Sequence, residues 1–80
     1  MNYEEFAKSF GLKLSEEFKL IGEPVNHIFY FKKNGLYFDI INPPMFYYKV
    51  DKNYIADPKL LHLMLTGERK VEKIKNEKVD

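Results

Sequence analysis

The sequence predicts an α+β fold, a small two-layer domain in which an antiparallel sheet of three to four strands packs against N- and C-terminal helices. Runs of β-branched and aromatic residues flank Asn34-Gly35, a dipeptide typical of two-residue hairpin loops. Apolar residues recur at helical spacing near the N-terminus, and an Asp-Pro helix start precedes a second apolar stripe. Helices that flank a run of strands indicate a two-layer α+β domain.

The hairpin forms the centre of the predicted sheet. Asn34 and Gly35 both tolerate the positive φ that a type I′ turn requires, so we expect them at its two central positions. This turn would pair Phe31 with Phe38. One face would then carry the core residues Phe29, Phe31, Leu36, Phe38 and Ile40. The opposite face would carry Tyr30, Lys32, Tyr37 and Asp39.

Two helices have recognisable ends. Asn2 is a capping residue for the first helix, and Gly11 provides its left-handed end. Its apolar positions are Tyr3, Phe6, Ala7 and Phe10. The second helix begins with Asp57 as the cap and Pro58 at the first helical position, and it ends at Gly67. Its apolar stripe comprises Leu60, Leu61, Met64 and Leu65.

Residues 12–22 admit two interpretations. Leucine and phenylalanine alternate there as in a strand, whereas Ser15-Glu16-Glu17 is also a plausible helix start. We favour a strand over residues 17–21.

The alternation over residues 46–50 predicts a further strand, followed by a turn at residues 51–53. A short edge strand is expected at residues 70–74. The chain is therefore expected to form a single domain over residues 1–75, with residues 76–80 as a frayed tail.

Composition narrows the functional classes. The 80 residues carry 13 basic and 12 acidic side chains, so a net charge of +1 indicates no strong long-range attraction to a polyanion. Cysteine is absent, which excludes disulfides and thiolate metal sites. The first residues lack the basic region of a signal peptide, and no apolar run approaches the roughly 20 residues of a membrane helix. We expect a cytoplasmic protein without a membrane partner.

No catalytic, metal or cofactor site is predicted. His27 and His62 have no further ligand at metal-binding spacing. Ser9 and Ser15 lack the glycine context of a nucleophile elbow, and the paired glutamates are adjacent, so they point in different directions. The sequence therefore favours a non-enzymatic protein without a cofactor or a small-molecule substrate.

The outer hairpin face is the candidate partner-binding site. Its predicted residues, extended by the next strand, are Tyr30, Lys32, Tyr37, Asp39, Tyr47 and Lys49. Tyrosines on an exposed sheet provide contact area for a protein partner. Aromatic residues interleaved with lysine also suit single-stranded nucleic acid, through base stacking and phosphate neutralisation. A third interpretation is purely structural: Tyr30 bonds Asp39 and Lys32 covers Tyr37 as ordinary cross-strand pairs.

The element order, with Gly22-Glu23-Pro24-Val25-Asn26-His27 before a strand, resembles the double-stranded-RNA-binding domain. That family carries a Gly-Pro-x-His-type element in a strand loop, so the resemblance implies that His27 contacts a minor groove. The family's Lys-Lys-x-Ala-Lys run at the last helix is replaced here by Asp57-Pro58-Lys59-Leu60-Leu61, whose acidic cap would repel phosphate. We do not assign the chain to this family.

The sequence favours a small protein-interaction module that binds another protein or forms a homodimer. Compact, cysteine-free, aromatic-rich chains are frequent among accessory proteins of phages and mobile elements, which suggests an accessory protein that binds or inhibits a larger host protein. The alternative is a nucleic-acid-binding module that uses the aromatic and lysine side chains of the hairpin.

Overall fold

The structure is a computed structural model that describes residues 2–42 and 45–74, with side chains for residues 2–41 and 51–74. It confirms the α+β class, with two helices and five strands in the described residues. In chain order the elements are α1 (Tyr3–Ser9), β1 (Phe18–Ile21), β2 (His27–Lys32), β3 (Gly35–Asn42), β4 (Met45–Ile55), α2 (Pro58–Thr66) and β5 (Lys70–Lys73). The predicted frayed tail, residues 76–80, lies outside the described residues.

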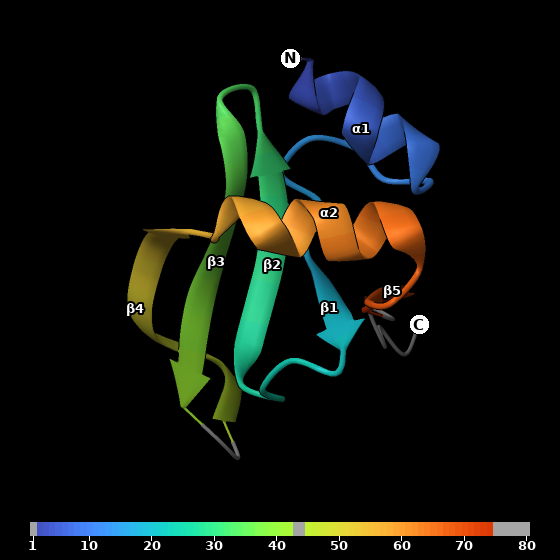
Figure 1. Cartoon of the computed structure of the whole chain (residues 1–80). Helices are drawn as coiled ribbons and strands as arrows, with labels where there is room; N and C mark the ends of the chain where they lie inside the picture. Colours follow the sequence, from blue (N-terminus) through green and yellow to red (C-terminus); the bar gives the residue numbers. More distant parts are fainter. Residues whose placement is uncertain (1, 43–44, 75–80) are drawn as a thin grey trace, which may run out of the picture.

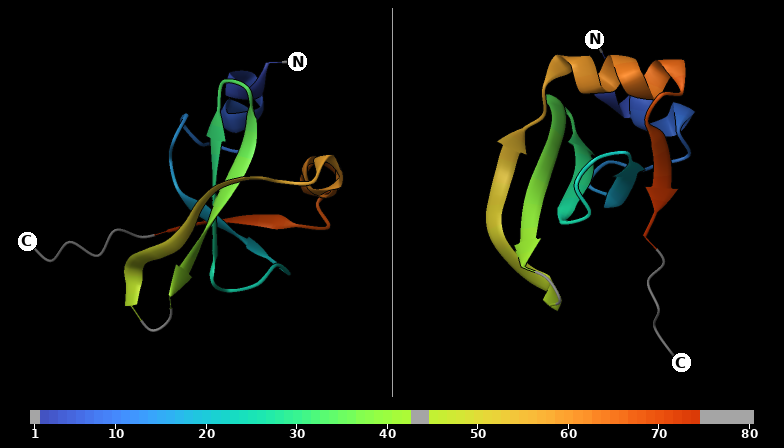
Figure 2. Two further views of the ribbon diagram at one scale, coloured as in Figure 1. Left: turned by 90° about the vertical axis from the view of Figure 1, so that its left-hand side faces the viewer. Right: turned by 60° about the horizontal axis from the view of Figure 1, so that its bottom comes forward.

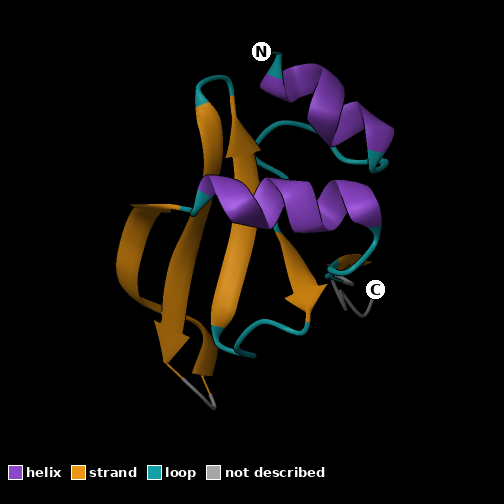
Figure 3. Cartoon of the chain, in the orientation of Figure 1, coloured by secondary structure: helices purple, strands orange, loops and turns teal. Residues whose placement is uncertain are grey.

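The five strands form one antiparallel sheet in the order β4-β3-β2-β1-β5. Helix α2 runs across the sheet from the β4 edge to the β5 edge, so that β5 pairs with β1 (Figure 1). The sheet is strongly twisted: β1 and β5 cross the direction of β2 and β3 steeply (Figure 2). Helix α2 covers the middle of one sheet face, and both ends of β3 extend beyond the helix (Figure 3).

Both helices begin and end where the sequence predicts. The Asn2 Oδ1 accepts hydrogen bonds from two backbone N–H groups of the first turn of α1, at 3.0 and 3.3 Å. Asp57 caps α2 through one such bond at 2.9 Å, and Pro58 occupies the first helical position. Gly11 and Gly67 adopt left-handed conformations, with φ of 74° and 86°. Local backbone chemistry thus decides both helices.

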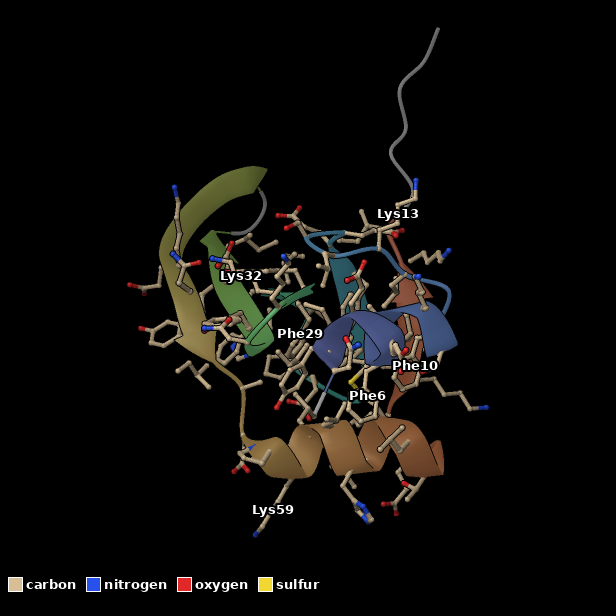
Figure 4. The ribbon with its side chains drawn as sticks, turned by 90° about the horizontal axis from the view of Figure 1, so that it is seen from above. Phe6, Phe10, Lys13, Phe29, Lys32 and Lys59 are labelled. Atoms are coloured by element: carbon tan, nitrogen blue, oxygen red, sulfur yellow. The ribbon has the colours of Figure 1, made fainter. Side chains whose placement is uncertain are left out.

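The core lies between α1, α2 and the sheet. Phe18, Phe29 and Phe31 are fully buried at its centre. The Phe18 and Phe31 rings stack with centroids 5.8 Å apart, and the Phe10 ring of α1 stacks on Phe31 at 6.5 Å. Phe29 points from the hairpin into the layer between the sheet and α2, and Phe6 and Phe10 extend into the same layer from α1 (Figure 4). The predicted core face of the hairpin is confirmed for Phe29, Phe31, Leu36 and Phe38.

The hairpin register differs from the predicted one. Lys32 pairs with Gly35, and Phe31 pairs with Leu36 instead of Phe38. The type I′ turn is wrong as well, because neither Asn34 nor Gly35 has a positive φ. Each partner moves by two positions along β3, which leaves every side chain on its predicted face.

Aromatic pairing across the strands explains this register. It sets Phe29 opposite Phe38 and Tyr30 opposite Tyr37. The ring centroids of these pairs lie 5.5 and 6.1 Å apart. Each such pair contributes about 0.2 to 1 kcal/mol. The loop still has two residues, but it is shifted by one position to Lys33 and Asn34.

The predicted turn at residues 51–53 is wrong, because β4 continues through it to Ile55. Lys52 and Asn53 lie opposite the single residue Asp39, which makes a β-bulge. Asn53 adopts a left-handed φ of 64°. The polar residues that indicate a turn in the sequence therefore form a bulge in the structure. The bulge bends β4 toward the sheet face opposite α2 (Figure 4).

The two shortest strands agree with the sequence. Strand β1 confirms the strand interpretation over the helical one, although it begins at Phe18. Strand β5 is the expected short edge strand, and three of its four side chains are exposed and charged. In the described residues, neither helix has the length and apolar composition needed to cross a membrane.

Candidate functional site

The structure divides the predicted partner-binding residues into three groups. Tyr30 and Asp39 are buried, with exposed fractions of 6% and 4%. Lys32 is exposed and Tyr37 is half-buried. The side chains of the other two, Tyr47 and Lys49, lie outside those that the structure describes. The first pair therefore offers little surface to a partner.

Tyr30, Asp39 and Asn53 form a hydrogen-bonded group on this face, which we call the Asp39 cluster. The Tyr30 hydroxyl lies 2.7 Å from the Asp39 Oδ1 and 2.7 Å from the Asn53 Oδ1. The Asn53 backbone N–H donates to the same Asp39 oxygen at 2.8 Å. Burial, followed by the bond to Asp39, raises the pKa of Tyr30 well above its usual value, so the hydroxyl stays protonated. The cluster joins β2, β3 and the bulge of β4.

Lys32 lies over the two tyrosines of the same face, on the side of the hairpin away from α2 (Figure 4). Its Nζ is 5.2 Å from the Tyr37 ring centroid and 5.8 Å from that of Tyr30. It also donates a hydrogen bond to the Asn53 Oδ1 at 3.3 Å. These are the cross-strand contacts expected if the outer hairpin face has a purely structural role. They place the Lys32 ammonium over the ring faces on which a nucleic-acid base would have to stack.

A different surface lies on the α2 side of the sheet. His27, Phe38 and Tyr54, from β2, β3 and β4, stack as three neighbouring rings, which we call the aromatic row. The His27 and Phe38 centroids are 4.7 Å apart at 21°, and the Phe38 and Tyr54 centroids are 5.2 Å apart at 22°. Tyr54 at the outer end is 43% exposed. The row is therefore a continuous aromatic surface that runs out to the β4 edge.

A cavity of about 280 Å³ lies between α2 and the two inner rings of this row; we call it the α2 groove. Its apolar lining includes His27, Phe29, Phe38, Leu60 and Leu63. It lies just below the range of about 300 to 1,000 Å³ that is usual for small-molecule sites. Its size and lining suit one apolar or aromatic side chain of a binding partner.

The rim of the α2 groove is polar, with Glu23, Asp57 and Lys59. The Glu23 Oε2 accepts a bond from the Arg69 Nε at 2.8 Å, which links the loop before β2 to the segment after α2. Gly22 permits this approach: a Cβ there would lie only 3.2 Å from the Arg69 side chain. The ion pair fixes one wall of the groove.

Sequence reasoning missed this site because the sequence does not show how closely α2 packs on the core face of the hairpin. The structure leaves a cavity between α2 and the half-buried His27 and Phe38 rings. One signal was present: the aromatic residue Tyr54 stands three residues before the helix cap Asp57. Apolar side chains at a strand end beside a helix indicate a surface patch.

Comparison of the chain with protein-family models, with curated proteins and with solved structures finds no match. The functional argument therefore rests on the geometry of the chain itself.

Proposed function

We propose that this chain is a non-enzymatic protein-interaction module whose partner docks on the aromatic row and the α2 groove. The observation that carries the proposal is the exposure of Tyr54, the outer ring of the aromatic row, beside a cavity lined by the two inner rings. Large aromatic and aliphatic side chains left in water gain free energy when a partner covers them.

The shape of the site indicates how the partner binds. An anchor side chain of the partner, aromatic or aliphatic, fills the α2 groove and contacts Phe38 and Leu63. The partner surface around it covers Tyr54. Buried anchors surrounded by contacts that exclude water carry most of the free energy in protein interfaces. The partner is therefore a protein that presents an exposed apolar side chain.

The composition of the chain bears on its biological origin. The chain is short, free of cysteine and rich in aromatic residues, with seven Phe and six Tyr. We propose that it is a phage or mobile-element accessory protein, located in the cytoplasm, that binds or inhibits a larger host protein. Occupation of a surface requires no catalytic group in the accessory protein.

Matched substitutions test the docking surface. Partner proteins are captured from the source cells with the immobilised wild-type chain, and the dissociation constant of the purified partner is then measured by calorimetry. Tyr54→Thr is expected to weaken binding about tenfold or more. Ile55→Thr is the control, because Ile55 is also exposed at the end of β4 but pairs with Tyr37, so its side chain lies on the opposite face of the sheet. The proposal fails if both variants weaken binding equally.

Homodimer formation through the same surface is the other form of the proposal. Sedimentation equilibrium of the wild-type chain distinguishes the two, because a homodimer would be seen in the absence of any other protein. Tyr54→Thr would then shift the chain to monomer, whereas Ile55→Thr would not.

The nucleic-acid alternative receives less support from the geometry. Base stacking on the outer hairpin face needs free ring faces, but the Lys32 ammonium lies over both tyrosine rings and bonds Asn53. The buried Asp39 carboxylate beneath also opposes phosphate.

A further inference from the structure

A second hollow, of about 600 Å³, opens between the end of α1, the loop that leads to β1, and β5. Three lysines line it: Lys8 from α1, Lys13 from the loop and Lys73 from β5. They come from segments up to 65 residues apart in sequence, which the pairing of β5 with β1 brings together. We call these three residues the lysine cluster.

The charges of the lysine cluster are not neutralised by the described part of the chain. None of the three ammonium groups forms an ion pair with a described carboxylate. Glu16 is the acidic residue in the lining, and its Oε1 accepts a bond from the Lys13 backbone N–H at 2.9 Å. The carboxyl end of α1 adds at most about −0.5 charge. Three positive charges against these two contributions leave a surplus of about +1.5.

The backbone of the loop brings further donors to the hollow. Gly11 has a left-handed φ of 74°, and a Cβ there would lie 3.6 Å from the Lys73 Nζ, so this ammonium lies close to the loop. Ser15 is exposed and left-handed, with φ of 69°. The Leu14 N–H has no acceptor within the described residues. Both Ser15, which carries a hydroxyl, and Leu14, whose amide bonds no described acceptor, belong to the residues that line the hollow.

We propose that the lysine cluster binds a phosphate monoester group. Such a group carries about −1.5 to −2 charge at pH 7 and three acceptor oxygens. That charge matches the surplus, and the oxygens match the ammonium, hydroxyl and amide donors. A single carboxylate would leave part of the surplus unmatched. The phosphate belongs either to a free phosphorylated small molecule or to a phosphorylated side chain of a protein.

Amide chemical shifts of the full chain test the site. Inorganic phosphate, phosphoserine and a phosphoserine peptide are titrated separately at constant ionic strength. We expect saturable shifts in residues 11–16 with all three probes. Lys13→Gln and Lys73→Gln should each weaken binding about two- to fivefold, the effect of one exposed charge pair. Lys59→Gln is the control, because Lys59 lies on the opposite side of the molecule (Figure 4).

The outcomes distinguish the two sources of the phosphate group and also test the site itself. Tighter binding of the phosphoserine peptide than of phosphoserine supports a protein side chain as the source, and equal binding supports a small molecule. The proposal is overturned if sodium chloride at equal ionic strength gives the same shifts, or if Lys59→Gln weakens binding as much as Lys13→Gln. Thermal melts of the variants verify that each is folded.

Discussion

The backbone N–H of Asn53 donates a hydrogen bond to the buried carboxylate of Asp39 at 2.8 Å, although Asn53 belongs to the edge strand β4. This bond holds the bulge that bends β4, and Tyr54 follows the bulge directly. The Asp39 cluster on one face of the sheet therefore positions Tyr54, a residue of the proposed docking surface on the opposite face. The Asp39 cluster therefore contributes both to the stability of the fold and to the position of the proposed docking surface.

Asp39→Ala is expected to lower the free energy of unfolding by about 2 to 4 kcal/mol. The substitution removes the acceptor of two hydrogen bonds and leaves the Asn53 N–H without a partner in a partly buried place. Urea denaturation followed by circular dichroism measures the change. Asp51→Ala, at an exposed acid of the neighbouring strand β4, is the control and should stay within about 0.5 kcal/mol.

We expect Tyr30 to make the free energy of unfolding fall at high pH. Its pKa is raised in the folded chain, so above pH 10 the unfolded chain loses the phenol proton while the folded chain keeps it. The folded state then binds more protons, and the free energy of unfolding falls as pH rises, by about 1.4 kcal/mol per pH unit for this group. Tyr30→Phe should remove that share of the slope. Equal slopes in urea titrations of both proteins between pH 9 and 11 would contradict this prediction.

Phe31→Ala is expected to cost about 3 to 5 kcal/mol, because the ring is fully buried and stacks on Phe18 and Phe10. A small domain has little more stability than this, so the variant should be largely unfolded at 37 °C. Ile21→Ala, at an exposed strand position, should cost less than about 1 kcal/mol. A thermal melt of the Phe31 variant within a few degrees of wild type would refute the core assignment.

Asp57→Ala should lower stability by about 0.5 to 2 kcal/mol and leave the fold unchanged. The Asp57 Oδ1 accepts a hydrogen bond from the Lys59 N–H at the start of α2. Asp57→Asn retains the acceptor and should lose a few tenths of a kcal/mol. Backbone chemical shifts typical of extended structure over residues 60–65 in the alanine variant would contradict this prediction, because the cap would then be required for the helix itself.

Oligonucleotides should bind weakly. With a net charge of +1 and Lys32 engaged by two tyrosines, we expect no sequence-independent binding tighter than about 10⁻⁴ M at physiological salt. Fluorescence anisotropy with labelled single-stranded DNA and RNA measures this. Micromolar affinity with a log–log salt slope of roughly −3 would favour the nucleic-acid alternative instead.

The sequence predicts the parts of the fold that local chemistry decides. Asn2, Asp57, Pro58 and Gly67 act on backbone groups within a few residues, and both helices begin and end accordingly. The hairpin register was predicted wrongly, because a local preference of Asn34-Gly35 competes with aromatic pairs that form only across the assembled strands.

The candidate site depends on contacts that no local pattern shows. Tyr30 and Asp39 are buried because Asn53 of a distant strand bonds them, so the outer hairpin face offers less surface than its composition suggests. Tyr54 of the aromatic row is accessible at 43% exposure, and a cavity remains between α2 and the two inner rings. Both facts follow from the path of β4 and α2 over the hairpin.

Chemical-shift mapping of the labelled chain with its captured partner tests the docking surface most directly. Our account predicts that the largest changes occur at Phe38, Tyr54 and Leu63, with residues of the outer hairpin face nearly unchanged. Changes concentrated at Lys32 and Tyr37, with the α2 groove unaffected, would contradict it.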